Sequence, residues 1–562
     1  MRLFFILLTF LLVSCSDKEL LLTDKILLSQ GELQGFQEDN TNYYLGIPYA
    51  EPPTGALRWK PPVNHSGWDG NLLATSKPNS CMQPTGFGLG PFIGLWVEGS
   101  GMNWFSKKLL NIGANLGPFI SSAEDSQSED CLFLNIITPQ GNNSKLPVMM
   151  WIHGGGHRFG DGSGSYINPD IASNDVIFVS INYRLGALGY FAHPALSEES
   201  PNKSSGNYGT LDQIQALKWI SKNIDKFGGD PNNVTIFGES AGGHSVGQIM
   251  SSPLSKGLFH KAIAQSGYGV ANVQKLNSEH GNINSAENSG VKYAKYLGVD
   301  GKENILELLR AIPAEDLLTV GELENDAFNE LDIEISSAWH PNVDGWVFNN
   351  SVLETSRAGN SHNVPLLIGF NADEGSSLIP LFYTREAHKE DKDWIKSSWD
   401  LVFPGYNEPM PTSVKNWALN INGDSYTAAQ RFWGDLTFGS VAYFAAINHS
   451  KINENTYFYY FNKSPSSPKQ TIGATHGIEI MYLFNSWIPG WPRDDADNAI
   501  SKQMRTDWTN FAKTGDLSIN GWNKFTEDMP SQMNYEVNIN QSNSSQLDLF
   551  KSIYEYLSVN GS

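Results

Sequence analysis

The sequence is short of basic residues, of cysteines and of charge in general. Its 562 residues include 38 Lys and Arg against 59 Asp and Glu, which gives a formal net charge of −21. Because contact with phosphate groups requires a basic surface, this deficit argues against nucleic acid as a partner. We interpret the negative net charge as a source of solubility. The alternative is that it creates an electrostatic field that attracts cationic substrates.

Repeats and long low-complexity tracts are also lacking. Charged residues make up 17% of the chain and hydrophobic residues 40%, a balance typical of globular and not of disordered proteins. The length alone would suggest several domains, but the order of the motifs described below favours one large domain.

The N-terminus has the pattern of an export signal. Arg2 precedes an apolar run from Leu3 to Val13, which is the length of a signal-peptide core and short for a membrane span. The segment Leu12-Val13-Ser14-Cys15 resembles a bacterial lipobox, in which the cysteine is lipidated. We therefore predict a membrane-anchored protein of the bacterial cell envelope, periplasmic or on the outer surface, with its lipid on Cys15. An ordinary secretory signal that contains a cysteine, and hence a secreted protein, is the alternative.

The two remaining cysteines are Cys81 and Cys131. Export to an oxidising compartment would allow them to form a disulfide bond. Closing a loop of about fifty residues could contribute on the order of 4 kcal/mol in the chain-entropy model. Two buried free thiols are the alternative.

Most of the chain alternates between short apolar runs and helix-like stretches, the clearest helix spanning Leu211 to Ile224. This alternation is typical of an α/β fold whose sheet is mostly parallel and buried on both faces. The predicted strands are Leu146 to Ile152, Val176 to Tyr183, Val234 to Phe237, Ala262 to Gln265, Pro365 to Phe370 and Tyr457 to Phe461.

The sequence is divided as follows: residues 1–14 form the signal peptide, 15–28 a tether, 29–550 one domain, and 551–562 a tail. Insertions are expected near 82–130, 275–360 and 376–455. In the first of them, Phe105, Leu109 and Ile112 fall at helical spacing, and Trp96 and Trp104 are candidates for a lid or a wall of the site.

The segment Gly238-Glu239-Ser240-Ala241-Gly242 has the pattern of a nucleophile elbow. It follows a predicted strand and precedes a helix-like stretch, which is the context that the motif requires. In such an elbow the serine occupies a strained turn, and glycines two residues before and after it let the helix approach the strand. Ser240 is therefore the candidate nucleophile.

A serine hydroxyl needs a base to take its proton, and the base needs an acid to orient it. In α/β-hydrolases the acid follows the nucleophile along the chain and the histidine comes last. Glu374, directly after a predicted strand, is the best acid, and its neighbour Asp373 is the rival. His476 is the last histidine of the chain. We expect His362 and His388 to be surface residues.

Acyl transfer also needs N–H groups that stabilise the oxyanion. The segment His153-Gly154-Gly155-Gly156 follows a predicted strand and has the pattern of an oxyanion loop. The amide of Ala241, at the start of the helix after the elbow, would supply a further donor.

Taken together, these motifs resemble those of the type B carboxylesterases, the cholinesterase-like branch of the α/β-hydrolases. The resemblance extends from Tyr44 to about Trp522. The further segments that carry it are Phe227 to Gly243, Ser128 to Asn135, Asn182 to Gly189, Gly206 to Gln213 and Trp508 to Asp516.

The resemblance implies an α/β-hydrolase fold and a catalytic triad of Ser240, Glu374 and His476, which favours Glu374 over Asp373. It implies an oxyanion hole formed by Gly155, Gly156 and Ala241. It also implies a disulfide bond between Cys81 and Cys131, and structural ion pairs of Arg58 with Glu129 and Arg184 with Asp212. Glu239 and Ser266 correspond to positions near the catalytic histidine of relatives.

Two features depart from the family pattern. His157 stands where many relatives have phenylalanine, which predicts a more polar wall of the site. The loop between Cys81 and Cys131 is longer than in familiar members, and its tryptophans cannot be aligned with the choline-binding tryptophan, which argues against choline esters as substrates.

The sequence therefore predicts a serine carboxylesterase that cleaves small ester substrates through an acyl-enzyme intermediate and needs no metal or organic cofactor. A lipase, thioesterase or amidase would use the same residues. A non-catalytic binding or adhesion protein of the same superfamily is the alternative from another class. The sequence leaves the oligomeric state open.

Overall fold

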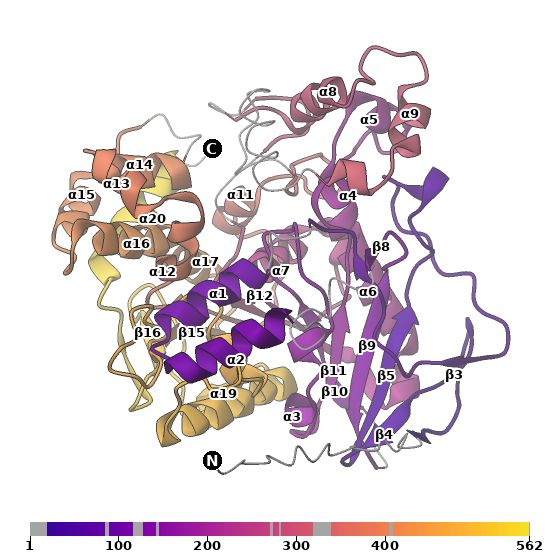
Figure 1. The fold of residues 1–562 in the computed structure, drawn as a ribbon, viewed down its shortest axis with the longest axis horizontal. Helices are drawn as coiled ribbons and strands as arrows, with labels where there is room; N and C mark the ends of the chain where they lie inside the picture. Colours follow the sequence, from indigo (N-terminus) through magenta and orange to yellow (C-terminus); the bar gives the residue numbers. More distant parts are fainter. Residues whose placement is uncertain are drawn as a thin grey trace, which may run out of the picture.

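A twelve-stranded sheet forms the centre of the protein (Figure 1). The computed structural model describes residues 20–84, 89–115, 127–141, 145–269, 274–279, 283–318, 339–403 and 408–560. In spatial order the strands are β1 (Leu21–Leu22), β4 (Phe36–Glu38), β5 (Thr41–Pro48), β9 (Phe133–Pro139), β11 (Ile177–Ile181), β10 (Leu146–Ile152), β12 (Gly229–Glu239), β13 (Lys261–Gln265), β14 (Leu366–Asn371), β15 (Thr456–Phe461), β16 (Ser531–Tyr535) and β17 (Asn540–Asn543).

Neighbouring strands are parallel from β11 through β16, and the pairs at both ends of the sheet are antiparallel. The predicted α/β class with a large, mostly parallel sheet is confirmed. Each of the six predicted strands is present, and every residue of β11, β13, β14 and β15 is buried. Burial on both faces explains why these strands are continuous apolar runs and do not alternate.

Two small sheets lie beside the central one. The first consists of β2 (Ile26–Leu28), β3 (Gly31–Gln34) and β6 (Asn71–Leu73); the second pairs β7 (Ser80–Cys81) with β8 (Gln127–Ser128).

Helices cover the central sheet and continue into the insertions. Those between or after the strands are α3 (Pro169–Ala172), α4 (Gly186–Tyr190), α5 (Pro194–Glu199), α6 (Tyr208–Asn223), α7 (Ala241–Ser251), α18 (Glu479–Leu483) and α19 (Asp495–Thr514). The predicted helix from Leu211 to Ile224 corresponds to α6. Short 3₁₀ turns span Gly55–Leu57, Gly164–Tyr166, Ile224–Phe227, Pro253–Ser255, Glu315–Leu317 and Ser518–Asn520.

The insertions are helical where the structure describes them. The first contains α1 (Leu89–Gly99) and α2 (Trp104–Asn115), the second α8 (Ala286–Tyr296), α9 (Ile305–Ala311) and α11 (Val352–Arg357). The third contains α12 (Gly375–Phe382), α13 (Arg385–Glu390), α14 (Trp394–Val402), α15 (Thr412–Leu419), α16 (Ser425–Gly434), a π-helical turn (Asp435–Gly439) and α17 (Ser440–Ser450). Figure 1 shows α13 to α16 grouped with the last helix, α20 (Leu547–Asn560), and shows α8 and α9 near α5.

Both ends of the domain extend beyond the boundaries drawn from the sequence. The expected tether contains β1 and β2, which pair with other strands. The expected tail from 551 continues α20 as far as Asn560, and Ile553 and Leu557 are buried there, because they continue the helical spacing of Leu549 and Phe550. The signal sequence and Cys15 lie outside the described residues. Within the described part, no helix has the length and apolarity needed to cross a membrane.

Candidate active site

Ser240 occupies the sharp turn between β12 and α7. Its backbone angles are φ 55° and ψ −122°, a conformation that a residue with a Cβ adopts only at a cost. The flanking glycines are required by close packing: a Cβ on Gly242 would lie 2.0 Å from the carbonyl oxygen of Ile152 in β10, and one on Gly238 would lie 2.6 Å from the same atom. The geometry is that of the predicted elbow.

Glu374 and His476 meet near the ends of two neighbouring strands. Glu374 follows β14, and His476 lies in the loop that follows β15. Oε2 of Glu374 lies 2.5 Å from Nδ1 of His476, and both side chains are buried. A short contact between a carboxylate and Nδ1 fixes the orientation of the imidazole and directs Nε2 away from the acid.

Two donors hold the other oxygen of Glu374. The hydroxyl of Ser266 donates to Oε1 over 2.6 Å, and the backbone N–H of Asn371 donates to the same oxygen over 2.7 Å. Asp373, the rival acid, accepts instead from the backbone N–H of Ala474 and lies 3.9 Å from Arg431. The geometry therefore distinguishes the two neighbouring carboxylates.

Nε2 of His476 lies 3.2 Å from Oε1 of Glu239, a buried oxygen that has no hydrogen-bond partner. Burial alone would lower the pKa of His476, but the carboxylates of Glu239 and Glu374 raise it to about 9. Burial raises the pKa of Glu239 to about 8, against the opposing effect of His476. Among the described contacts, the Ser240 hydroxyl has no hydrogen bond to His476.

A third buried carboxylate, Glu479, was not identified from the sequence. It accepts hydrogen bonds from the side-chain amides of Gln265 and Asn371. Burial, followed by the charge of Glu374, raises the pKa of Glu479 to about 7. It lies one helical turn after His476 in sequence, a spacing that could have identified it as a neighbour.

The loop after β10 brings N–H groups beside the elbow. Gly155 and Gly156 have φ values of 98° and 61°, the left-handed region that glycine tolerates. Their N–H groups have no protein acceptor among the described residues, and the N–H of Ala241, as the first residue of α7, has none within the helix. A Cβ on the preceding Gly154 would lie 3.1 Å from the Cβ of Ser240, so the loop and the elbow are in contact.

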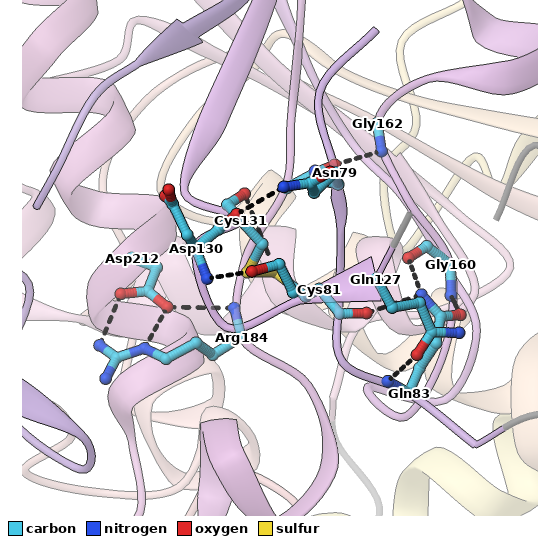
Figure 2. Close-up of a disulfide and its surroundings, with 12 residues drawn as sticks. Asn79, Cys81, Gln83, Gln127, Asp130, Cys131, Gly160, Gly162, Arg184 and Asp212 are labelled. Carbon is cyan, nitrogen blue, oxygen red and sulfur yellow. Dashed lines mark hydrogen bonds and ion pairs between the residues drawn. A yellow bond between two sulfur atoms is a disulfide. The ribbon is translucent and has the colours of Figure 1, made fainter. Parts of the chain in front are cut away.

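The disulfide bond between Cys81 and Cys131 is present and is connected to this loop (Figure 2). Gln83 accepts from the N–H of Gly160 over 2.8 Å and donates to its carbonyl over 3.0 Å, so the segment after Cys81 supports the far end of the oxyanion loop. Figure 2 also shows the ion pair of Arg184 with Asp212, at 2.7 Å. Arg58 and Glu129 form the second expected pair, at 2.5 Å.

Aromatic side chains surround His476. The ring of Phe438, in the π-helical turn, lies 4.7 Å from the imidazole between centroids, and Phe92 in α1 lies at 6.1 Å. Trp96 in α1 is buried against Phe92 and Trp491, whereas Trp104 in α2 is 71% exposed. Of the two candidate tryptophans, only Trp96 lies in this wall. The side chains of Leu109 and Ile112 lie outside the described set.

Three histidines differ from expectation. His157, expected in a wall of the site, is 1% exposed and contacts Ser245 and His340. The expectation that His388 is a surface residue is wrong: it is 7% exposed and contacts the hydroxyls of Tyr383 and Ser425. His362 is half-buried and contacts the carbonyl of Ser252. Neither lies at the site.

Known proteins resemble this chain over most of its length. The sequence profile of the Carboxylesterase family matches residues 23–551. Carboxylesterase 1E of Rattus norvegicus is 32% identical over 522 residues, which cover 89% of this chain and 86% of the relative. The para-nitrobenzyl esterase of Bacillus subtilis is 30% identical over 513 residues, covering 89% and 92%. The fumonisin B1 esterase of Sphingopyxis macrogoltabida is 31% identical, covering 86% and 81%.

Solved structures of PNB esterases have the same fold as this chain. A PNB esterase superimposes with a TM-score of 0.75 at 28% identity, covering 94% of this chain and 99% of that one. The protein therefore has the α/β-hydrolase fold. It belongs to the carboxylesterase family and is a carboxylic-ester hydrolase.

Proposed function

We propose that the protein hydrolyses carboxylic esters of small molecules through an acyl-enzyme formed on Ser240, with His476 as base and Glu374 as the acid that orients it. The observation that carries the proposal is the 2.5 Å contact of Glu374 with His476 beside a strained serine. Strained serine turns of this kind present the hydroxyl at the top of the sheet.

In the first half-reaction, Oγ of Ser240 attacks the carbonyl carbon while Nε2 of His476 takes the hydroxyl proton. The carbonyl oxygen becomes an oxyanion, which the N–H groups of Gly155, Gly156 and Ala241 stabilise. The bond to the alcohol oxygen then breaks, and His476 returns its proton to the departing alcohol.

In the second half-reaction, water attacks the acyl carbon and gives its proton to His476. The acid leaves, and Ser240 regains its proton. The hydroxyl of Ser240 has to form a hydrogen bond to Nε2 for the first transfer, and we expect this contact to form when substrate binds, because catalytic hydrogen bonds often tighten only in the complex.

The test is Ser240→Ala, assayed with a short-chain nitrophenyl ester and with a fluorophosphonate probe. We expect the wild type to turn over the ester and to be labelled on Ser240, and the variant to do neither while keeping its far-UV circular dichroism. Turnover by the folded variant would disprove the role of Ser240. A wild type that folds but neither turns over nor is labelled would favour the non-catalytic binding protein.

We further propose that the protein is exported and anchored by lipid on Cys15. The disulfide bond supports export, since such bonds persist mainly in oxidising compartments. Detergent phase partition of the full chain should move from the detergent phase to the aqueous phase in Cys15→Ala. Unchanged partition would contradict the anchor.

A further inference from the structure

Two sets of side chains contact different parts of the proposed machinery. The aromatic rings of Phe92 and Phe438 pack on His476. The imidazoles of His157, His244 and His340 instead lie beside the oxyanion loop and the first turn of α7. This inference rests on the proposed function and concerns which half of the ester each set contacts.

The reaction geometry places the alcohol half of the ester beside the aromatic rings of Phe92 and Phe438. In the tetrahedral intermediate, the alcohol oxygen must face His476 in order to receive its proton, and the oxyanion must face Gly155 and Gly156. The remaining substituent, the acyl group, therefore points away from His476. The imidazoles, which are associated with the loop and with α7, are placed to meet it.

His157 links His340 to α7. Oγ of Ser245 accepts from Nε2 of Gln213 over 3.0 Å and lies 3.1 Å from Nε2 of His157. The His157 ring also hydrogen-bonds the backbone of Ala241, and its Nδ1 lies 3.4 Å from Nδ1 of His340. In the neutral ring of His340, Nε2 carries the proton whenever Nδ1 accepts from His157.

His244 lies beside these residues. It follows Ser240 by four residues, with its N–H bonded to the Ser240 carbonyl over 2.9 Å. Its Cδ2 is packed so closely on Gly267 that a Cβ there would lie 2.4 Å away. Burial lowers the pKa of His244 to about 4 and, with the further effect of Arg158, lowers that of His340 to about 3, so both rings are neutral at pH 7.

The rings of His244 and His340 can form further hydrogen bonds. Both side chains are only partly buried, and in the described part of the chain neither nitrogen of His244, nor Nε2 of His340, contacts a protein partner. A hydrocarbon acyl chain would cover these polar groups without replacing their hydrogen bonds to water, which costs free energy.

We propose that this enzyme prefers esters whose acyl group carries a hydrogen-bond-accepting oxygen a few atoms from the scissile carbonyl, received by His340 and His244. His340 and His244 act as donors, and His157 is a positioning residue that contacts Nδ1 of His340. The alcohol half is apolar and lies against Phe92 and Phe438.

Three benzyl esters of nearly equal shape test the preference: benzyl 5-methylhexanoate, benzyl 5-oxohexanoate and monobenzyl glutarate. Their acyl ends carry two methyl groups, one methyl and one oxygen, or two oxygens. We expect kcat/KM, measured by release of benzyl alcohol, to be about tenfold or more higher for the oxygen-bearing esters than for the hydrocarbon. The ranking of the ketone against the carboxylate identifies which acceptor is preferred.

The variants locate the effect. His340→Phe should bring the ratio of the ketone to the hydrocarbon ester close to one. Phe92→Leu is the matched control on the aromatic side: it should change selection among alcohols and leave the acyl ratio unaltered. Circular dichroism and fluorophosphonate labelling verify that each variant is folded and has a reactive serine.

A hydrocarbon ester that wild type hydrolyses as fast as both oxygen-bearing esters would overturn the inference, whatever the variants do. So would a ratio that persists in folded His340→Phe. Either result, with Ser240→Ala inactive, would leave the proposed catalytic function intact; turnover by Ser240→Ala would instead disprove that function.

Discussion

Oε1 of Glu239 lies 3.2 Å from Nε2 of His476, the nitrogen that accepts the proton of Ser240 in the proposed mechanism. A buried carboxylate at this position favours the protonated imidazole and so competes with the role of His476 as a base. The same carboxylate would stabilise the imidazolium that forms in each transition state. Glu239 therefore has two opposing effects: it reduces the fraction of neutral His476 before the reaction, and it stabilises protonated His476 during the reaction.

The first prediction concerns pH. Because the pKa of His476 is raised to about 9, the neutral, active form is a minority below that pH. We expect kcat/KM for a neutral ester to rise with pH, with its midpoint near pH 9 and its plateau above that pH. In Glu239→Gln the carboxylate is lost, and the midpoint should move to lower pH by about one unit or more.

The control for this profile is Glu198→Gln, an exposed carboxylate paired with Lys203, which should leave the midpoint unchanged. A midpoint that is the same in wild type and in Glu239→Gln would contradict the coupling of Glu239 with His476.

The second prediction concerns the support of Glu374. Ser266 donates to its Oε1 over 2.6 Å. Losing a hydrogen bond to a charged group costs about 1.5–3 kcal/mol, so Ser266→Ala should lower kcat by about 10- to 100-fold with little change in KM. Glu374→Gln should lower kcat further, by about 10⁴-fold, because the amide favours the wrong imidazole tautomer.

Ser255→Ala is the matched control, since Ser255 is also buried and donates over 2.6 Å, but to the carbonyl of Ile249. Its effect should fall on thermal stability and not on kcat. Equal losses of kcat in the two alanine variants would show that Ser266 has no specific role.

The order of elements could be predicted because burial on both faces leaves a continuous apolar run, as in Leu146 to Ile152, which coincides with β10. The elbow could be predicted because only glycine fits at 238 and 242. Ser240, Glu374 and His476 were placed by chain order and by family resemblance. The distances among them come from the fold, in which β12, β13, β14 and β15 follow one another across the sheet.

Other parts of the site depend on contacts between distant residues. Nothing near Glu479 in the sequence shows that Gln265 and Asn371 enclose it, and Phe438 reaches His476 only through the π-helical turn. His340 lies in the insertion expected near 275–360, and its contact with His157, 183 residues earlier, has no local signal. His388 was expected at the surface, yet Tyr383 and Ser425 enclose it.

The third prediction concerns the disulfide bond. Its ends are 50 residues apart, and the loop carries α1, whose Phe92 contacts His476. In the chain-entropy model, the paired change of Cys81→Ser and Cys131→Ser should lower the free energy of unfolding by about 4 kcal/mol. The thermal midpoint of wild type should fall under reducing conditions, whereas that of the double variant should not respond to reductant.

Activity adds a second measurement on this variant. Gln83 links the segment after Cys81 to Gly160 of the oxyanion loop, so we expect kcat to fall at temperatures at which the variant is still folded. An unchanged kcat and an unchanged thermal midpoint would together show that the bond supports neither the fold nor the loop.

The fourth prediction compares two glycine-to-alanine substitutions. At Gly242 the new methyl group would lie 2.0 Å from the carbonyl oxygen of Ile152, a backbone atom that cannot move without displacing β10. Gly242→Ala should therefore destabilise the protein by about 3 kcal/mol or more and reduce labelling of Ser240 by a fluorophosphonate. At Gly94, in α1, a methyl group meets nothing within 4 Å, and Gly94→Ala should be neutral or stabilising by up to about 1 kcal/mol. Chemical denaturation and probe labelling of both variants measure the difference, and a Gly242→Ala protein as stable and as reactive as Gly94→Ala would mean that close packing of α7 on β10 is not what positions the serine.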